Sequence, residues 1–171
     1  AVRDVSKMLT HHLADSLSIV QYVSGERVLD VGTGAGLPGI PLAVFLPHKH
    51  FVLLDSVSKK SRFLQQVVVT LGLKNVTIIN QRVESYNTTE LFDVIIARAF
   101  ACCEKVVSLT QHLCGKQGCY LLQKGVYPAD ELDALTMPHR VLALDVPGLD
   151  ANRHLVIIKN GVNDGENHCG S

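Results

Sequence analysis

The stretch RVLDVGTGAGLPGIP, residues 27–41, constrains the fold more than any other part of this chain. A short apolar run leads into an acidic residue, and four glycines follow within eight positions. Glycine allows the positive φ angles and the close backbone approach that other residues resist. Turns of this kind follow the first β-strand in proteins that bind a dinucleotide, a nucleoside triphosphate or S-adenosylmethionine (SAM). The rest of the sequence has to decide between these ligands.

Strand and helix patterns alternate along most of the chain. Apolar residues make up 47% of the 171 residues, which is enough for an aliphatic core. We expect strands at residues 28–31, 50–54, 76–79, 92–97 and 119–123, and helices at residues 7–22, from Pro38 onward, from Ser58 to Gly72, and at 104–114 and 129–135. This alternation predicts a parallel α/β sheet with right-handed crossovers.

The end of the chain departs from the alternation. The stretches RVLALDV and HLVIIK read as strands, and no helix lies between them, so they are expected to pair antiparallel at one edge. A seven-stranded, mostly parallel sheet with such a hairpin is the Rossmann-like arrangement of class I SAM-dependent methyltransferases. Residues 1–160 are expected to form one domain and residues 161–171 a flexible tail.

One long helix can be described in more detail. Ser58 is expected to cap its start and Gly72 to end it. One apolar face is predicted for this helix, made by Phe63, Leu64, Val67, Val68 and Leu71.

Asp30 favours SAM over the other ligands. It precedes Gly32 by two residues, at the strand end where a dinucleotide would place its pyrophosphate. An acid there repels phosphate but suits the α-ammonium group of SAM, directly or through water. The G-x-G-x-x-G pattern at Gly34, Gly36 and Gly39 keeps an NAD site open, and a tight turn without a ligand is the simplest alternative. No G-x-x-x-x-G-K-[ST] motif occurs, which argues against a P-loop.

Three further residues fit an adenosine-containing ligand, and a functional role is expected for a fourth, Arg98. Asp55 ends the second strand about 20 residues beyond the glycines, where NAD and SAM folds hold an acid against ribose hydroxyls; a helix N-cap is the alternative. The backbone of Val83 and the side chain of Glu84 are expected to face the adenine, although a solvated loop acid suits Glu84 nearly as well. Arg98 stands in the apolar run IIARAFA, where an unpaired charge is costly. We expect a functional role for it, with a structural ion pair as the alternative.

The cysteines and histidines predict neither a metal site nor a nucleophile. Five cysteines without a C-x-x-C pair argue against zinc and disulfides and fit a reduced, cytoplasmic setting. Cys102 and Cys103 follow the fourth strand, where a pyrimidine C5 methyltransferase would need a thiolate, but no second motif accompanies them. The eight histidines show no metal-binding spacing.

Charge and hydropathy exclude two broad classes of partner. The formal net charge is zero, which argues against a general polyanion-binding protein and leaves room for a local basic patch. No run of 18 apolar residues occurs, so no membrane span is expected.

Taken together, the motifs resemble one family, the bacterial small-subunit ribosomal RNA guanine-N7 methyltransferases known as RsmG or GidB. The matching stretches occur in family order to about residue 159: HHLADSL, RVLDVGTGAGLPGIPLA, LLDSVSKKSRFLQQVV, LGLKNV, RVESY, FDVIIARAFA, LLQKG and RHLVIIK. The resemblance implies SAM as the cofactor and N7 of one guanine in the 530 loop of 16S rRNA as the methyl acceptor. The implied partner is 16S rRNA or the small ribosomal subunit, and we expect a monomer.

The resemblance also implies roles for particular residues. SAM contacts are implied for Gly32, Leu37, Val83, Glu84 and Arg98, and the physical arguments above add Asp30, Gly34 and Asp55. Lys124 in the QKG stretch matches a family lysine and is expected on an RNA-facing rim with Lys59, Lys60 and Arg62.

The chain departs from the family pattern in two ways. The family has a further helical stretch ahead of HHLADSL, so part of the SAM lid or RNA surface is expected to be missing here. Cys102 and Cys103 also follow RAFA where small polar residues are usual, and no role is carried onto them.

The predicted reaction needs little acid–base chemistry. Guanine N7 has an exposed lone pair and no proton to lose, so it needs in-line positioning and a dry pocket. Arg98 is therefore expected to position the reactants rather than act as a base. A non-catalytic SAM- or RNA-binding module and an NAD-dependent oxidoreductase remain as alternatives.

Overall fold

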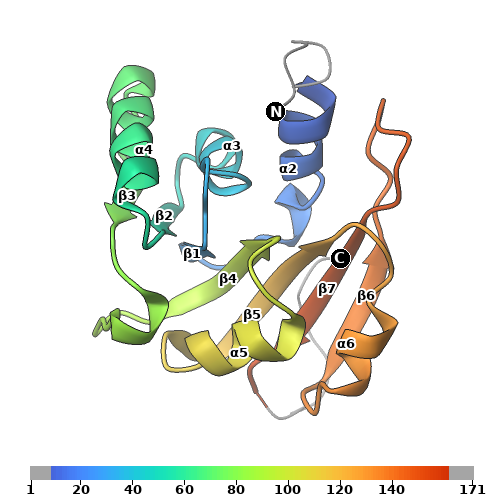
Figure 1. Ribbon diagram of the computed structural model, residues 1–171. Coiled ribbons are helices and arrows are strands. Elements are labelled where there is room, and N and C mark those ends of the chain that lie inside the picture. Colours follow the sequence, from blue (N-terminus) through green and yellow to red (C-terminus); the bar gives the residue numbers. More distant parts are fainter. Residues whose placement is uncertain (1–8, 162–171) are drawn as a thin grey trace.

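A seven-stranded sheet forms the centre of the computed structural model, which describes residues 9–161 (Figure 1). The strand order is β3-β2-β1-β4-β5-β7-β6. The strands are β1 (Arg27–Val31), β2 (His50–Leu54), β3 (Val76–Ile79), β4 (Phe92–Arg98), β5 (Cys114–Lys124), β6 (His139–Ala143) and β7 (His154–Lys159). Strands β1 to β5 pair in parallel, whereas β7 runs antiparallel to both β5 and β6. The predicted mostly parallel sheet with an antiparallel edge hairpin is confirmed.

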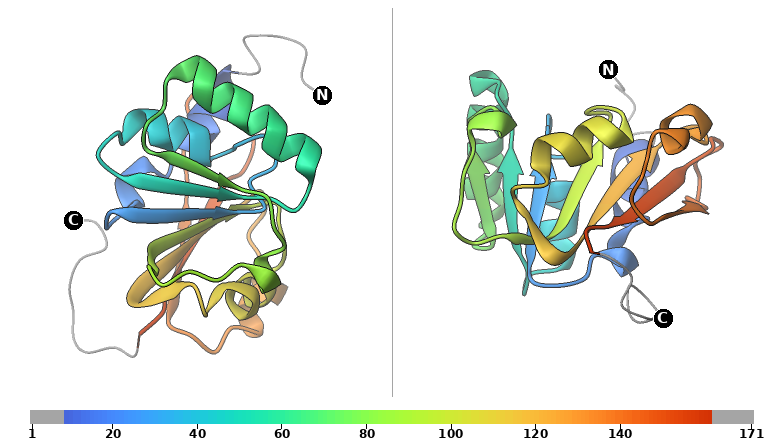
Figure 2. Two further views of the ribbon diagram at one scale, coloured as in Figure 1. Left: turned by 90° about the vertical axis from the view of Figure 1, so that its left-hand side faces the viewer. Right: turned by 90° about the horizontal axis from the view of Figure 1, so that it is seen from below.

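Helices cover both faces of the sheet (Figure 2). One face packs against α5 (Cys103–Thr110), α6 (Ala129–Asp133) and the short 3-10 helix η3 (Val83–Ser85). The other packs against α3 (Gly39–Phe45), α4 (Ser58–Leu71) and the N-terminal helical segment. The central strands are buried on both faces, which explains why their sequences are continuous apolar runs rather than alternating ones.

The N-terminal helix is less regular than expected. Residues 7 and 8 of the predicted helix lie outside the described residues, and the rest forms a π-helix η1 (Leu9–Ala14), α2 (Asp15–Leu17) and a 3-10 helix η2 (Val20–Tyr22). The hydroxyl of Ser16 donates to the carbonyl oxygen of His12, and that of Ser18 to the carbonyl oxygen of Asp15. Such local bonds compete with regular helical hydrogen bonding.

The start of α4 differs from the prediction. Ser58 is the first residue of α4 rather than its cap, and its hydroxyl donates to Oδ1 of Asn80 at 2.8 Å. Oδ1 of Asp55 instead accepts the backbone N–H of Val57 at 2.9 Å. The predicted end is confirmed, because Gly72 closes the helix in the left-handed conformation with φ 63°.

The predicted apolar face of α4 is only partly buried. Leu64 is completely buried and Val67 and Val68 are half-buried, whereas Phe63 and Leu71 are each 54% exposed. The helix packs over β3, a four-residue strand at the edge of the sheet, so part of its surface overhangs the sheet (Figure 1).

The remaining elements agree with the prediction apart from their ends. Strand β5 begins five residues before the predicted start, and α5 and α6 are shorter than predicted. Of the predicted tail, residues 162–171 lie outside the described residues.

Candidate active site

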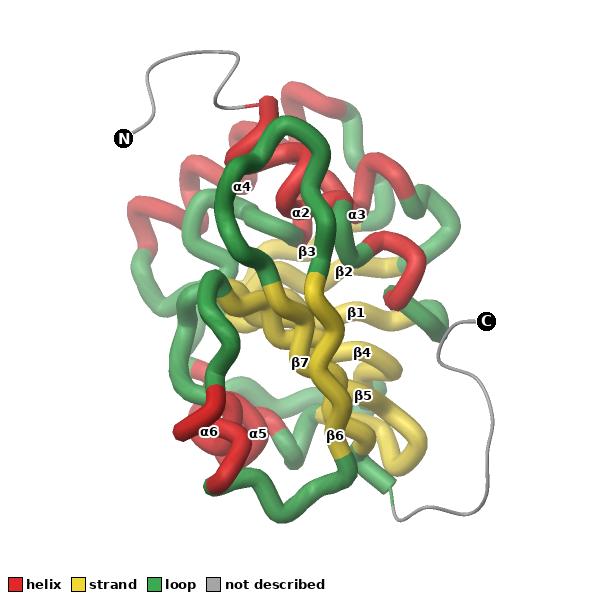
Figure 3. The backbone as a smooth tube through the Cα atoms, turned by 90° about the vertical axis from the view of Figure 1, so that its right-hand side faces the viewer, coloured by secondary structure: helices red, strands yellow, loops and turns green. Residues whose placement is uncertain are grey.

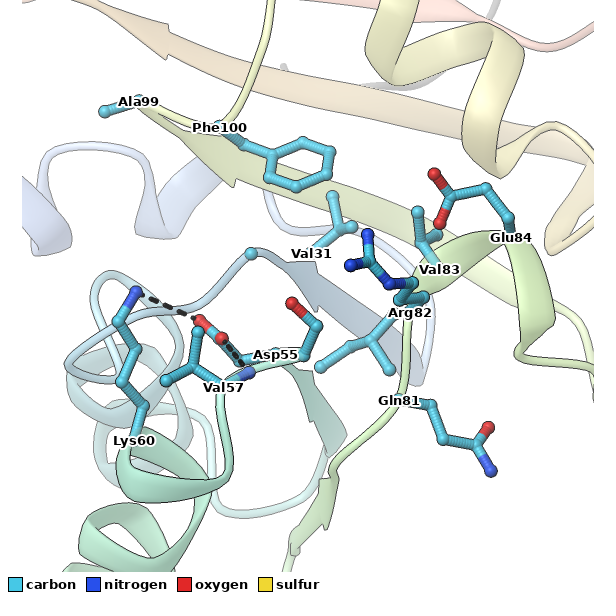
Figure 4. Close-up of a pocket in the computed structure, with 13 residues that line it drawn as sticks. Val31, Asp55, Val57, Lys60, Gln81, Arg82, Val83, Glu84, Ala99 and Phe100 are labelled. Atoms are coloured by element: carbon cyan, nitrogen blue, oxygen red, sulfur yellow. Dashed lines mark hydrogen bonds and ion pairs between the residues drawn. The ribbon is translucent and has the colours of Figure 1, made fainter.

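A cavity of about 290 Å³ opens at the carboxyl ends of the central parallel strands (Figure 4). Val31 of β1 and Leu54 of β2 form its floor, and residues 81–84 and 99–100 contribute its walls. The neighbours of β1 are β2 and β4, so the strand order reverses here. Open α/β sheets bind ligands in the crevice at such a reversal.

Gly32 and Phe100 shape one wall of this cavity. Gly32 has φ 66°, and a Cβ atom added to it would lie 2.2 Å from Cδ2 of Phe100. The ring of Phe100 lies beside Val31 in the close-up (Figure 4). A side chain at position 32 would therefore have to displace an aromatic wall of the cavity, which explains the glycine.

Asp55 links the glycine-rich turn to the start of α4. Its Oδ2 accepts the backbone N–H of Gly34 at 2.9 Å and its Oδ1 that of Val57 at 2.9 Å. Nζ of Lys60 lies 3.6 Å from Oδ2 (Figure 4). Each carboxylate oxygen has two acceptor sites, so the group can bind ribose hydroxyls while it holds the turn. Asp55 lines the cavity, as its predicted role requires.

Asp30 lies beneath the turn rather than in the cavity. It is completely buried, and its Oδ2 accepts the hydroxyl of Thr33 at 2.7 Å and the N–H of Gly39 at 2.9 Å. Burial raises the pKa of this carboxyl group to about 7. Its Oδ1 is buried without a hydrogen-bond partner in the described structure. The predicted contact with the ammonium group of SAM stays a prediction, and Oδ1 is the atom free to make it.

The other predicted cofactor residues separate into two groups. Val83 and Glu84 line the cavity at the start of η3, as expected. Leu37 is half-buried and does not line it, so its implied SAM contact also stays a prediction.

Arg98 lines a second cavity of about 450 Å³, and Ala99 lines both this cavity and the first one. Nη1 of Arg98 lies 3.3 Å from Oδ2 of Asp15, and Nε of Arg153 lies 3.0 Å from Oδ1 of the same carboxylate. The ion pair considered as an alternative for Arg98 is therefore present. Ala99 has φ 52° and is the one non-glycine residue with positive φ among residues 9–161. Such a conformation in a cavity wall is typical of functional sites.

Three of the predicted RNA-facing residues lie on α4 and the fourth lies at the end of β5. Lys59 and Arg62 are exposed on α4, and Lys60 lines the first cavity beside Asp55. Lys124 lies in the second cavity with its side chain 16% exposed. Its Nζ lies 2.7 Å from Oε2 of Glu131, so its charge is already paired.

Cys103 does not have the properties of a nucleophile. It is buried, and burial raises the pKa of its thiol to about 12. The thiolate, which is the reactive form, is therefore disfavoured at neutral pH. Cys102 is exposed and precedes α5.

The described residues contain no group of three or more histidine, cysteine or acidic side chains arranged to hold a metal ion. Within residues 9–161, no helix combines the length and apolarity that a membrane span requires.

The strand order, the antiparallel edge and the cavity at the strand ends define the class, that of Rossmann-like, class I SAM-dependent methyltransferases. A SAM-dependent methyltransferase from Aquifex aeolicus has the same fold, with a TM-score of 0.68 and 18% identity over 90% of this chain and 92% of that one. So has the N-methyltransferase NodS from Bradyrhizobium japonicum in complex with S-adenosyl-L-homocysteine, with a TM-score of 0.64 and 15% identity over 86% of this chain and 85% of that one.

Within this class, the chain belongs to the GidB family, rRNA small subunit methyltransferase G, whose family model matches residues 1–156. The ribosomal RNA small subunit methyltransferase G of Nitrosococcus oceani is 49% identical over 162 residues, which are 93% of this chain and 76% of the relative. That of Idiomarina loihiensis is 47% identical over 161 residues, 92% of this chain and 78% of the relative. The resemblance found in the motifs is confirmed. The chain is a SAM-dependent methyltransferase, not an NAD-dependent oxidoreductase or a non-catalytic module.

Proposed function

We propose that this enzyme transfers the methyl group of SAM to N7 of a guanine in the 530 loop of 16S rRNA. It acts in the cytoplasm as a monomer, and its partner is the small ribosomal subunit or its RNA. The observation that carries the proposal is that Ala99 lines both cavities, in a chain of this family. One cavity suits the methyl donor, and the other can receive the acceptor base.

The first cavity suits SAM in its position and in the hydrogen-bond acceptors that border it. Its volume of about 290 Å³ lies just below the usual range of small-molecule sites, roughly 300–1,000 Å³. Asp55 would hold the ribose, and Val83 with Phe100 would enclose the adenosine. SAM carries positive charge on its sulfur and its amino group, and the carboxylates of Glu84 and Asp55 border the cavity. The buried, unpartnered Oδ1 of Asp30 adds a third acceptor close to the turn.

The chemistry needs positioning more than proton transfer. When bound, SAM supplies a methyl group on a positively charged sulfur. Guanine N7 offers a lone pair without a proton, so no side chain has to act as a general base. The residues around Ala99 fix the relative position of the two sites, and the apolar wall at Phe100 excludes water. Well-oriented reactants of this kind gain on the order of 7–11 kcal/mol from positioning.

The test is transfer of labelled methyl from SAM to small ribosomal subunits taken from a strain that lacks the enzyme. We expect one labelled nucleotide, identified as 7-methylguanosine in the 530 loop. Subunits from a strain that has the enzyme serve as the control and should accept no label. Label at another atom or nucleotide would contradict the proposal. Absence of transfer while SAM binding is intact by calorimetry would also contradict it for this chain.

A further inference from the structure

Asp15 is a buried carboxylate shared by two arginines from distant parts of the chain. Its side chain is 4% exposed and lies between Arg98, at the end of β4, and Arg153, which directly precedes β7. The backbone carbonyl of Asp15 accepts the side-chain amide of Gln123 at 2.9 Å. These contacts fix both guanidinium groups relative to the sheet.

The cluster has an excess of positive charge. Two guanidinium groups face one carboxylate, and the nearby Lys124 is already paired with Glu131. An arginine has five N–H donors. Arg98 directs Nη1 to Asp15, and Arg153 directs Nε to Asp15 and Nη1 to the carbonyl oxygen of Asn152. Further donors remain on both groups, and both line the second cavity. The arrangement therefore suits an anion.

The position of the cluster indicates which anion it binds. The second cavity contains Ala99, which also lines the proposed SAM cavity. The loop between β6 and β7 ends at Arg153 and extends well beyond the sheet (Figure 3), so this side is bordered by an extended arm of the chain. In an RNA substrate, the anion closest to an acceptor base is a backbone phosphate, and arginine binds phosphate through two parallel N–H bonds.

We infer that Asp15 holds Arg98 and Arg153 side by side as a clamp for an RNA phosphate next to the acceptor guanine. This inference rests on the proposed function and adds a subsite to it. Arg153 contacts the phosphate directly, and Asp15 is a positioning residue that acts through both arginines.

The first test compares Arg153→Gln with Lys116→Gln. Both changes remove one positive charge, but Lys116 is exposed near the start of β5, away from the strand ends that form the site. Binding of unmethylated small subunits is measured by filter retention at several salt concentrations, and SAM binding by calorimetry. Arg153→Gln should weaken subunit binding on the order of tenfold and reduce the salt slope by about 0.7–0.9. It should leave SAM binding unchanged, and Lys116→Gln should change neither.

Two results would overturn the inference. If Arg153→Gln binds subunits as Lys116→Gln does, Arg153 contacts no phosphate. If it weakens SAM binding instead, the clamp holds the cofactor. Subunit binding and SAM binding are both measured without catalysis. A failure of the proposed function would show itself differently, because the unaltered chain would then bind subunits without methylating them.

The second test asks whether Asp15 acts by positioning. Asp15→Asn keeps the size of the side chain but removes the charge that both arginines face. We expect KM for subunits to rise several-fold, with a smaller change in kcat. A fall in kcat alone would contradict the role. If the thermal transition shows that Asp15→Asn does not fold, the Arg153→Gln comparison decides the inference by itself.

Discussion

Replacing Gly32 with alanine should weaken SAM binding through Phe100. An alanine at φ 66° is strained by about 1–2 kcal/mol, as expected for a residue in the left-handed region. Its Cβ would also lie 2.2 Å from Cδ2 and 2.9 Å from Cγ of Phe100, so the whole ring has to leave its place. Phe100 is 36% exposed, so the ring can move, but the cavity then loses its aromatic wall.

Gly72→Ala is a matched control for the backbone strain. Gly72 has φ 63°, and an added Cβ would have no atom within 4 Å. Both variants should lose about 1–2 kcal/mol of stability from strain, and 1 kcal/mol lowers Tm by roughly 2–4 °C in a chain of this size. Only Gly32→Ala should also lose SAM affinity, by about tenfold or more, which corresponds to about 1.4 kcal/mol or more.

Calorimetric titration with SAM and a thermal scan of both variants separate the two effects. Equal affinity of Gly32→Ala and Gly72→Ala for SAM would refute the role given to Phe100. In that case the ring of Phe100 at Gly32 is not part of the binding surface.

Three further predictions concern buried groups. Burial raises the pKa of Asp30 from 3.8 to about 7, so the folded protein keeps a proton that the unfolded chain releases, and stability should fall as pH rises across that interval. Asp30→Asn should remove this trend. In urea unfolding, the free energy of unfolding of the variant minus that of the unaltered protein should therefore increase from about pH 5 to pH 8. A difference that does not change with pH would contradict the raised pKa of Asp30. Iodoacetamide at neutral pH should label the exposed Cys102 well before the buried Cys103, whose pKa is about 12. Mass spectrometry after brief labelling measures the order, and earlier labelling of Cys103 would contradict the prediction. Asp55→Ala leaves the N–H of Gly34 without its acceptor, so SAM affinity should fall on the order of tenfold; calorimetry showing unchanged affinity would separate Asp55 from the site.

The fold could be predicted largely from local patterns. The bounds predicted for β2 and β3 match those in the structure, because buried parallel strands are short apolar runs between turn residues. The prediction that Ser58 caps α4 was wrong because Ser58 is already the first residue of the helix and its hydroxyl bonds Asn80, which is distant in the sequence. The exposed side chains of Phe63 and Leu71 show a second limit, since helical periodicity does not reveal that a helix overhangs the edge of its sheet.

The candidate site was predictable only where its residues follow strands. Asp55 and Val83 come soon after β2 and β3, so topology brings them to the same edge. Asp15 and Arg153 are 138 residues apart, and nothing local connects them. The available signal was Asp15 itself, an acidic residue within a predicted amphipathic helix. If such a residue is buried, its charge needs partners elsewhere in the fold. The positive φ of Ala99 could not be predicted from the sequence. Alanine rarely adopts this conformation, so its presence gives no hint of it.

The place of β7 in the sheet has a consequence for biosynthesis. Strand β7 forms hydrogen bonds with β5 on one side and β6 on the other, although it is the last strand along residues 9–161. About 30 residues separate it from β5, which takes about 2–6 s at a synthesis rate of roughly 5–20 residues per second. During that interval the part of β5 that pairs with β7, Cys119–Lys124, presents an open edge to other nascent chains. Chains that stop before His154 should therefore aggregate, even though they contain every residue that lines the proposed SAM cavity.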